Sequence, residues 1–288
     1  MGGLFLLALS LNLLVFASVL EIYFIDVGEG ESIYIETPDG SRILVDTGNL
    51  ITGYRVYRFL KRKDVNKLDL LIITHPHPDH MGGSFWLLQA LKVKKRCDNG
   101  QPLGKYIEQD IYKWYEELFR RGNYCTLKRG DKLNFGEVSF YILNPGSYYE
   151  NWNSNSLVIK IVYRDTSILL MGDATKSTER ELIKIYGEFL KSDLLKIGHH
   201  GAEDATSIEF IDLVAPKYAV ISIDKDNSKG YPSPNTINLL NRKGIKVYKT
   251  YEEGTITFIS DGASLKVGDF SLEILKKHYN FYIGGATN

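Results

Sequence analysis

One short stretch decides the fold of this chain: Thr74-His75-Pro76-His77-Pro78-Asp79-His80. It directly follows the apolar segment 68–73, which predicts a short buried strand. A loop at the end of a strand is where an α/β scaffold commonly presents functional groups. Four side chains within six residues are of types that bind transition metals, and the two prolines stiffen the loop that carries them. The stretch therefore predicts a metal site, with a histidine-rich loop that binds no metal as the alternative.

The histidines of the chain are grouped rather than scattered. Five of the six fall in two clusters, the first with His75, His77 and His80 and the second with His199 and His200. The sixth, His278, lies alone near the end of the sequence. His75 and His77 are two positions apart, so both imidazoles can reach one metal ion. Asp79 and His80 follow at once and can reach a second. This spacing predicts two metal ions side by side.

The first cluster resembles the His-x-His-x-Asp-His signature of the metallo-β-lactamase superfamily. The resemblance implies an α/β fold, the four-layer αββα sandwich, built as a single domain. It also implies two bound Zn²⁺ ions, with Mn²⁺ as an alternative. Asp173, in the segment 169–174, matches the aspartate that bridges the two ions, and the segment 195–201 matches the one that carries the last histidine ligand. The implied metal ligands are His75, His77, Asp79, His80, Asp173 and His199.

Either histidine of the second cluster could be that last ligand. We expect His199, because it leaves the strand end first, and we expect His200 beside the substrate as a proton donor, with Asp79 as the other catalytic residue. Two further aspartates match supporting positions. Asp46 resembles the buried aspartate that steadies the histidine loop in this superfamily. Asp26 has two interpretations: it supports the site in the same way, or it is a plain turn residue at the end of a strand.

The sequence departs from the superfamily pattern in two places. No histidine lies between His80 and His199, where many members have another ligand, and Asn155-Ser156 stands there instead. The metal at His75 and His77 would then keep positions open for water or substrate. Near the end, relatives often carry a histidine in a proline-rich stretch; if it helps to bind phosphate, either Tyr231 or Ser233 replaces it here or that role is lost.

A narrower resemblance covers roughly residues 20–260. The segments 24–32, 153–158 and 199–201 are similar to those of the hydrolase domain of competence DNA-uptake channel proteins, and of the free-standing exported hydrolases and choline-phosphate esterases related to it. The resemblance implies phosphodiester hydrolysis, in nucleic acid or a cell-envelope compound, by attack of a hydroxide that bridges the two metals. The alternatives are amide or ester hydrolysis, β-lactams included, and a metal-stabilised binding module without catalysis.

Charge does not single out a partner. The chain has 35 basic and 35 acidic residues, so no overall field attracts nucleic acid or anionic lipid. Nucleic acid would need a local patch, and the candidates are 61–63 and the run of Lys92, Lys94, Lys95 and Arg96. We expect these runs to be solvated surface, with a nuclease groove as the alternative. Cys97 and Cys125 could form a disulfide in an exported protein or remain free thiols.

The first 18 residues are uncharged and mostly apolar, and Ala17 and Ser18 suit a cleavage site. We expect residues 1–18 to be a signal peptide or membrane anchor, 19–267 the hydrolase domain and 268–288 a tail that adds an edge strand at 281–283. The protein would then act outside the cytoplasm and meet the membrane only through that anchor. Periodicity predicts helices and strands as follows: helices at 54–62, 83–91, 106–121, 177–190 and 235–242; strands at 20–25, 68–73, 156–163, 167–171, 194–197, 218–223 and 254–260.

Overall fold

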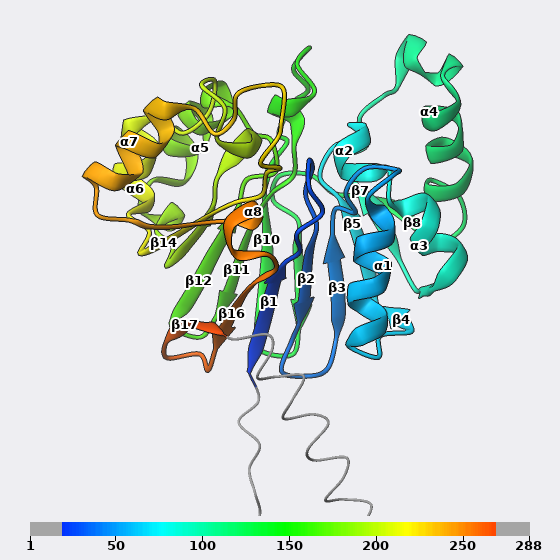
Figure 1. The fold of residues 1–288 in the computed structure, drawn as a ribbon, viewed down its shortest axis with the longest axis horizontal. Coiled ribbons are helices and arrows are strands. Elements are labelled where there is room, and N and C mark those ends of the chain that lie inside the picture. The colour runs from blue at the N-terminus through cyan, green and yellow to red at the C-terminus, as the bar shows by residue number, and fades with distance from the viewer. Residues whose placement is uncertain (1–18, 269–288) are drawn as a thin grey trace, which may run out of the picture.

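Two β-sheets pack face to face between two outer layers of helices (Figure 1). The structure, a computed structural model, describes residues 19–268. The first sheet has the strand order β17-β16-β1-β2-β3-β5-β7-β8, and the second has the order β15-β14-β13-β12-β11-β10-β9. Strands β4 and β6 form a separate pair. The four-layer αββα sandwich expected from the sequence is confirmed.

The strands have these bounds: β1 Leu20–Phe24, β2 Ile33–Glu36, β3 Arg42–Val45, β4 Lys67–Leu68, β5 Leu70–Ile73, β6 Lys92–Val93, β7 Arg96–Asp98, β8 Tyr124–Thr126, β9 Lys132–Phe135, β10 Val138–Asn144, β11 Val158–Tyr163, β12 Thr166–Leu170, β13 Leu194–Lys196, β14 Tyr218–Ile221, β15 Lys246–Lys249, β16 Ile256–Ser260 and β17 Leu265–Gly268. The α-helices have these bounds: α1 Gly53–Arg62, α2 Pro78–Met81, α3 Ser84–Ala90, α4 Asp110–Trp114, α5 Lys176–Tyr186, α6 Ile208–Val214, α7 Pro234–Arg242 and α8 Thr250–Glu253.

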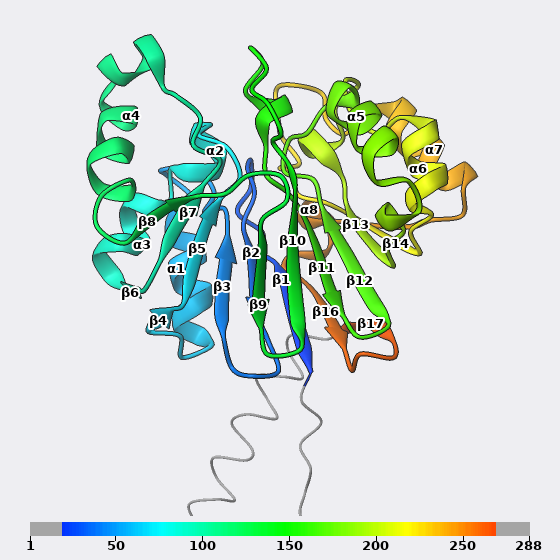
Figure 2. The ribbon, with the colours of Figure 1, turned by 180° about the vertical axis from the view of Figure 1, so that it is seen from behind.

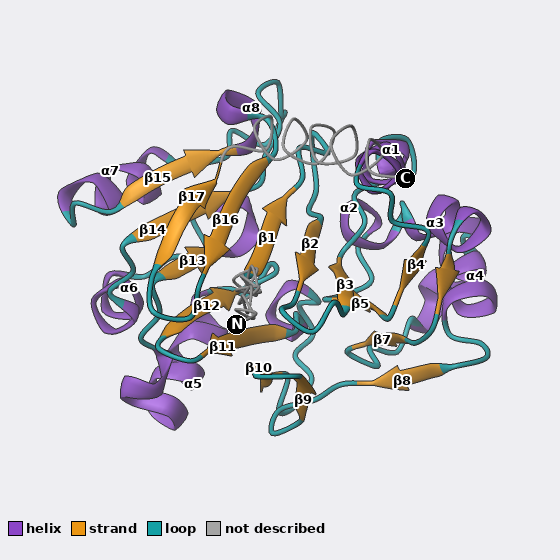
Figure 3. Ribbon diagram, turned by 90° about the horizontal axis from the view of Figure 1, so that it is seen from below, coloured by secondary structure: helices purple, strands orange, loops and turns teal. Residues whose placement is uncertain are grey.

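Apolar side chains on both faces of the central strands explain the four layers. In β1, Leu20, Ile22 and Phe24 point into the core between the two sheets. Tyr23 points to the other face, where its ring lies 5.9 Å from that of Tyr34 and packs against α1. Successive strand residues face opposite sides, so a strand that is apolar throughout must be covered on both. Seen along the strands, helices α1, α3 and α4 cover one sheet and α5, α6 and α7 the other (Figure 3).

The carboxyl ends of three strands meet at one edge of the sandwich. The histidine loop follows β5, residues 171–173 follow β12, and the turn Gly198–Gly201 follows β13. Strands β12 and β13 pair in parallel, so their ends lie next to each other at the same edge (Figure 2). The fold thus brings together the three segments in which the sequence placed its candidate ligands.

Most predicted elements are found within two or three residues of their expected bounds. The helix expected at 106–121 is wrong as a single helix. A 3₁₀ turn Gly104–Glu108, α4 and a π-helical turn Tyr115–Phe119 take its place, because Gln109 is extended at φ −82° and ψ 135°. Strands β15 and β17 and helix α6 were not predicted. Cys97 and Cys125, on adjacent strands β7 and β8, form a disulfide.

Within residues 19–268, none of the helices has the length and hydropathy that crossing a bilayer requires. The expected signal peptide or anchor at 1–18 lies outside the described residues, as does the edge strand expected at 281–283.

Candidate metal centre

The loop from strand β5 into helix α2 is held by a buried carboxylate. Asp46 is fully buried and accepts hydrogen bonds from the backbone N–H of Thr74 at 2.7 Å and from its hydroxyl at 2.8 Å. The same carboxylate lies 2.7 Å from Nδ1 of His80. With Nδ1 engaged in this way, His80 turns Nε2 toward the other candidate ligands. Asp46 therefore has the supporting position that the sequence predicted.

Two glycines allow close backbone contacts around helix α2: Gly83, just after the helix, lies against Thr47, and Gly30 lies against Asp79 in the helix. A Cβ atom on Gly83 would lie 2.0 Å from the carbonyl oxygen of Thr47, and one on Gly30 would lie 2.2 Å from the carbonyl oxygen of Asp79. Gly30 also has φ +115°, a conformation open to glycine. Such close backbone contact fixes where Asp79 and His80 stand. Asp26, by contrast, accepts from the N–H of Gly28 in its own turn and pairs with Arg55, so it is a turn residue.

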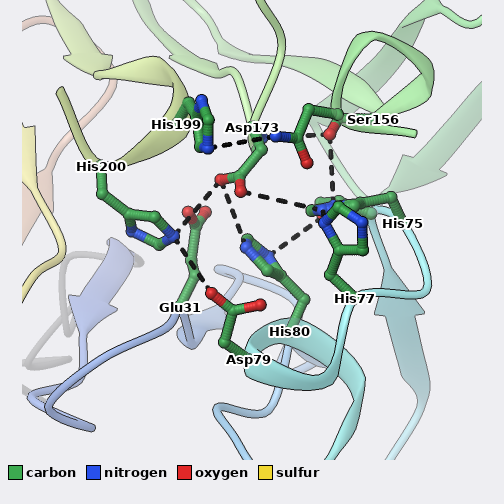
Figure 4. A network of polar contacts seen from close by, with 12 residues as sticks. Glu31, His75, His77, Asp79, His80, Ser156, Asp173, His199 and His200 are labelled. Carbon is green, nitrogen blue, oxygen red and sulfur yellow. Dashed lines mark hydrogen bonds and ion pairs between the residues drawn. The ribbon is translucent and has the colours of Figure 1, made fainter. Parts of the chain in front are cut away.

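The carboxylate of Asp173 lies in the middle of the candidate site, with its two oxygens facing different histidines (Figure 4). Oδ1 is 3.2 Å from Nε2 of His80 and 3.5 Å from Nε2 of His200. Oδ2 is 3.8 Å from Nε2 of His75. The backbone N–H of Asp173 donates to the hydroxyl of Ser156 at 3.0 Å. This is the position that a bridging aspartate needs.

The two adjacent histidines of the turn Gly198–Gly201 diverge. Both have left-handed backbone angles, with φ 45° at His199 and 52° at His200. Nδ1 of His200 donates to the carbonyl of Ser222 at 2.7 Å, which leaves Nε2 facing Asp173 and, at 3.6 Å, Asp79. Nδ1 of His199 lies 2.7 Å from a carboxylate oxygen of Asp204.

The assignment expected for this pair is therefore reversed. His199 was expected as the ligand and His200 as the proton donor, but it is His200 that joins Asp79 and His80. The expectation rested on chain order, whereas the left-handed turn directs the second imidazole inward. Nε2 of His199 lies 3.1 Å from the side-chain amide nitrogen of Asn153, outside both groups of candidate ligands.

Six side chains form two such groups around the shared carboxylate. His75, His77 and Asp173 have donor atoms within 4.8 Å of one another, and so do Asp79, His80 and His200. In the first group, Nε2 of His75 is 2.9 Å from Nδ1 of His77. Nitrogen and carboxylate oxygen donors of this kind suit Zn²⁺ and related divalent ions.

Three buried atoms of the site lack a hydrogen bond among the described residues: Nε2 of His80, Nε2 of His200 and Oδ1 of Asp173. They lie close enough for ion pairing, yet no directional hydrogen bond joins them. Buried polar atoms nearly always have a hydrogen-bond partner or a bound ion, so three unpartnered atoms that face one point indicate a ligand-binding position. A divalent cation there would satisfy all three, so the residues present fit a metal.

Opposite charges dominate the electrostatics of the site. Burial would lower the pKa of His80, but the carboxylates of Asp173 and Asp46 outweigh it and raise that pKa well above 6.5. Burial would raise the pKa of Asp173, but His80 and His200 hold it well below its usual range. Burial lowers the pKa of His75, and His80 lowers it further. The site therefore presents ionised carboxylates to any cation.

The segments that depart from the superfamily pattern have mixed roles. The Ser156 hydroxyl is 3.2 Å from Nδ1 of His75. The side-chain amide of Asn155 instead accepts a hydrogen bond from the N–H of Tyr149 and donates one to its carbonyl oxygen. The ring of Tyr231 meets that of His199 edge-on at 5.4 Å. Ser233 begins helix α7 as its N-cap, so it serves the helix.

Sequence reasoning missed a buried ion pair beside the site. Glu31 and Lys196 are both fully buried, and their charged groups are in direct contact. Lys196 also lies 3.3 Å from the carbonyl oxygen of Gly172. The available signal was a lysine inside the apolar strand 194–197, because a charge there needs a buried partner.

The basic runs do not border the site. Lys92, Lys94 and Lys95 are exposed and precede β7, which pairs in parallel with β5. They therefore lie at the end of these strands opposite to the histidine loop. Lys63, in the other run, is buried and pairs with Glu21 at 2.9 Å. The expectation of solvated surface fits Lys92, Lys94 and Lys95, while Lys63 is structural.

Comparison with known proteins agrees with this geometry. The family model described as Metallo-beta-lactamase superfamily matches residues 25–224. ComE operon protein 3 of Bacillus subtilis is 32% identical over 271 residues, covering 88% of this chain and 34% of that protein. Competence protein ComA of Neisseria gonorrhoeae is 28% identical over 235 residues, covering 81% of this chain and 31% of that protein. The chain spans about a third of the length of these curated relatives.

A solved structure shares the fold. The metallo-beta-lactamase fold protein YhfI from Bacillus subtilis aligns with a TM-score of 0.55 at 12% identity, covering 84% of this chain and 100% of that one. The family match covers well over half of the chain, and the four layers, the histidine loop and the central aspartate agree with it. This chain belongs to the metallo-β-lactamase superfamily.

Proposed function

We propose that the protein is a hydrolase that needs two divalent metal ions and cleaves phosphodiester bonds. One observation carries the proposal: the two oxygens of Asp173 face two separate groups of candidate ligands. A carboxylate placed in this way suits a pair of ions a few ångströms apart, which is the arrangement of two-metal hydrolases. Membership of a superfamily of metal-dependent hydrolases supports the same conclusion.

His75, His77 and Asp173 would hold one ion, and Asp79, His80, His200 and Asp173 the other. Zn²⁺ is the expected ion and Mn²⁺ the alternative, because the donors are imidazole nitrogens and carboxylate oxygens. Bound there, the ions would supply Lewis acidity and lower the pKa of water, so that no serine or cysteine nucleophile is needed. The first group has three protein donors, which leaves room for a substrate oxygen.

His199 is the residue placed to act on the leaving group. Asp204 contacts Nδ1 at 2.7 Å and fixes the ring, while Nε2 faces Asn153 on the partly exposed side of the site. Burial alone would lower the pKa of His199, but Asp204 and Asp173 raise it above 6.5. An imidazolium held there can donate a hydrogen bond, and then its Nε2 proton, to the departing oxygen.

Two further features bear on substrate and location. The relative named Competence protein ComA supports a nucleic-acid phosphodiester over a β-lactam, although the exposed lysine run lies away from the site. The disulfide between Cys97 and Cys125 supports an oxidising compartment, because such bonds are rare in the cytosol of mesophiles. We therefore propose that the enzyme acts outside the cytoplasm.

The test compares a chromogenic phosphodiester, bis(p-nitrophenyl) phosphate, with a chromogenic β-lactam, each with Zn²⁺, Mn²⁺ or a chelator. We expect metal-dependent turnover of the phosphodiester, lost in Asp173→Asn and retained in the control Asp165→Asn, which changes an exposed aspartate in a turn. If only the β-lactam is turned over, the proposed phosphodiesterase activity is wrong and the protein is an amide hydrolase. Full activity of Asp173→Asn would rule out the two-metal arrangement.

A further inference from the structure

Aromatic side chains cluster on the side of the candidate metal centre that holds His77. The indole of Trp152 stacks on the imidazole of His77, with ring centroids 5.7 Å apart and planes inclined by 26°. Tyr106 and Tyr112 meet the indole edge-on, at 4.9 and 5.8 Å. Tyr112 is 6% exposed and supports the cluster from beneath, whereas Tyr106 is 40% exposed.

Trp152 and its neighbour Asn153 lie against two partly exposed members of the site, His77 and His199. Trp152 covers His77, and the Asn153 amide reaches His199 at 3.1 Å. His77, Asp79 and His199 are the partly exposed members of the site, while His75, His80, His200 and Asp173 are buried beneath them. Trp152 is itself only partly buried. A substrate bound at the partly exposed His77 would therefore lie close to this indole.

The form of the cluster discriminates between ligands. The three rings contact one another directly, at distances normal for packed aromatic pairs, so no cage remains among them for a quaternary ammonium. What they offer instead is aromatic surface at the edge of the site. Tyr106 is exposed and Trp152 is partly buried, so part of this aromatic surface is open to a ligand.

We propose that Trp152, backed by Tyr106 and Tyr112, is a stacking platform for a nucleobase on the substrate, so that the natural substrate is a nucleoside-containing phosphodiester. The platform borders His77, which with His75 and Asp173 would hold the ion that has the smaller set of protein donors. A substrate phosphate bound there would bring its nucleoside close to Trp152. Stacking of a base on an aromatic side chain is tolerant of sequence and contributes roughly a tenfold or larger gain in binding. This inference rests on the proposed function.

The experiment compares two esters with the same leaving group, thymidine 5′-(p-nitrophenyl phosphate) and methyl p-nitrophenyl phosphate. We expect Trp152→Leu to lower kcat/KM for the thymidine ester about tenfold or more and to change the methyl ester by less than about threefold. Trp152→Phe should keep most of the preference, because it keeps an aromatic face. The matched control is Trp86→Leu, which removes a 47% exposed tryptophan whose ring contacts Phe85 on helix α3 and should alter neither ester.

A second readout does not depend on turnover. Binding of thymidine 5′-monophosphate, methyl phosphate and phosphocholine is measured by titration calorimetry on the Zn²⁺-loaded parent and on Trp152→Leu, after Zn²⁺ content is checked by elemental analysis. We expect thymidine monophosphate to bind the parent about tenfold or more tightly than methyl phosphate, and the variant to lose that difference while keeping its metal.

The outcomes separate the two proposals. If the parent hydrolyses neither ester, the proposed function fails, and the binding difference alone decides the platform. If Trp152→Leu lowers activity on both esters equally, leaves both unchanged, or loses metal, then Trp152 supports His77 and the platform is wrong. Tighter binding of phosphocholine than of thymidine monophosphate also overturns it.

Discussion

Asp46 and His80 are joined across the base of the site by a 2.7 Å contact between a carboxylate oxygen and Nδ1, with both side chains fully buried. Asp46 contacts none of the other candidate ligands within hydrogen-bonding distance, so it acts on the metal through the orientation of one imidazole. Supports of this kind raise the basicity of the ligand and fix its tautomer.

The first prediction follows from that contact. Asp46→Asn should weaken the ion held by Asp79, His80 and His200 about 10- to 100-fold while the other ion changes less. Competition with a chromogenic chelator measures both affinities. The control is Asp26→Asn, since the carboxylate of Asp26 accepts from Gly28 in its own turn and pairs with Arg55, away from the candidate ligands. Equal weakening by both variants would mean that the effect comes from lost negative charge and not from orientation.

The second prediction uses the two adjacent histidines as an internal comparison. His200→Ala should reduce bound Zn²⁺ from two ions to about one and abolish turnover, because Nε2 of His200 faces Asp79 and Asp173. His199→Ala should retain both ions and lower kcat by roughly 100-fold or more, the usual size of general-acid catalysis.

Elemental analysis and steady-state kinetics on both variants check this prediction. Asp204→Asn should lower kcat in the same direction as His199→Ala, because Asp204 holds the ring of His199. If His199→Ala loses an ion and His200→Ala keeps both, then His199 is the ligand and His200 is not.

The third prediction concerns pH. His80 has a pKa well above 6.5 in the metal-free protein, so binding an ion at Nε2 must displace a proton. Zn²⁺ affinity should therefore rise about tenfold per pH unit between roughly pH 6 and 8. His75 adds no proton release in this range, because burial holds its pKa well below 6.5 and it is already neutral.

The raised pKa of His80 also makes the stability of the metal-free protein depend on pH. A raised folded-state pKa means that His80 stabilises the metal-free fold fully below pH 6.5, and that this contribution is lost as the pH rises through the folded-state pKa. The gap in Tm between Zn²⁺-loaded and metal-free protein should thus widen with pH. Differential scanning fluorimetry at fixed free Zn²⁺ measures it, and Asp46→Asn should flatten the slope. A gap that narrows as the pH rises would contradict the proton displacement.

The fourth prediction concerns the disulfide, which closes a loop between cysteines 28 positions apart. Replacing Cys97 and Cys125 by serine should lower the free energy of unfolding by about 3–4 kcal/mol, chiefly by freeing the unfolded chain. Urea denaturation of the serine variant and of the parent, with and without reductant, measures this. Zn²⁺ content should stay at the parent value, since neither cysteine is near a candidate ligand. An unchanged urea midpoint would mean that the bridge does not form.

The sequence alone predicted the part of the site that depends on strand ends. An apolar strand followed by four ligand-type side chains indicated a metal site at His75 to His80, and the resemblance to the superfamily added Asp173 at the end of another strand. It could not distinguish His199 from His200. That distinction depends on two successive residues in left-handed conformations, which are uncommon outside glycine and which no local pattern marks here.

Two other features of the structure were not predicted from the sequence, and both depend on tertiary contacts. The amphipathic pattern of 106–121 predicted one helix, but an extended Gln109 splits it and lets Tyr106 and Tyr112 turn toward Trp152. The contact between Glu31 and Lys196 joins the loop before β2 to strand β13 of the other sheet, so only the fold reveals it. Tertiary contacts thus decide what short-range patterns leave open.

The position of Asp173 links metal binding to the joining of the two sheets. The histidine loop belongs to the sheet built mainly from the first half of the chain, while Asp173 and His200 belong to the other sheet. An ion bound between them would tie the layers together at one edge, and its binding free energy would add to the stability of the whole sandwich. Under the proposed function, the metal would then cross-link the two halves of the fold as well as take part in catalysis.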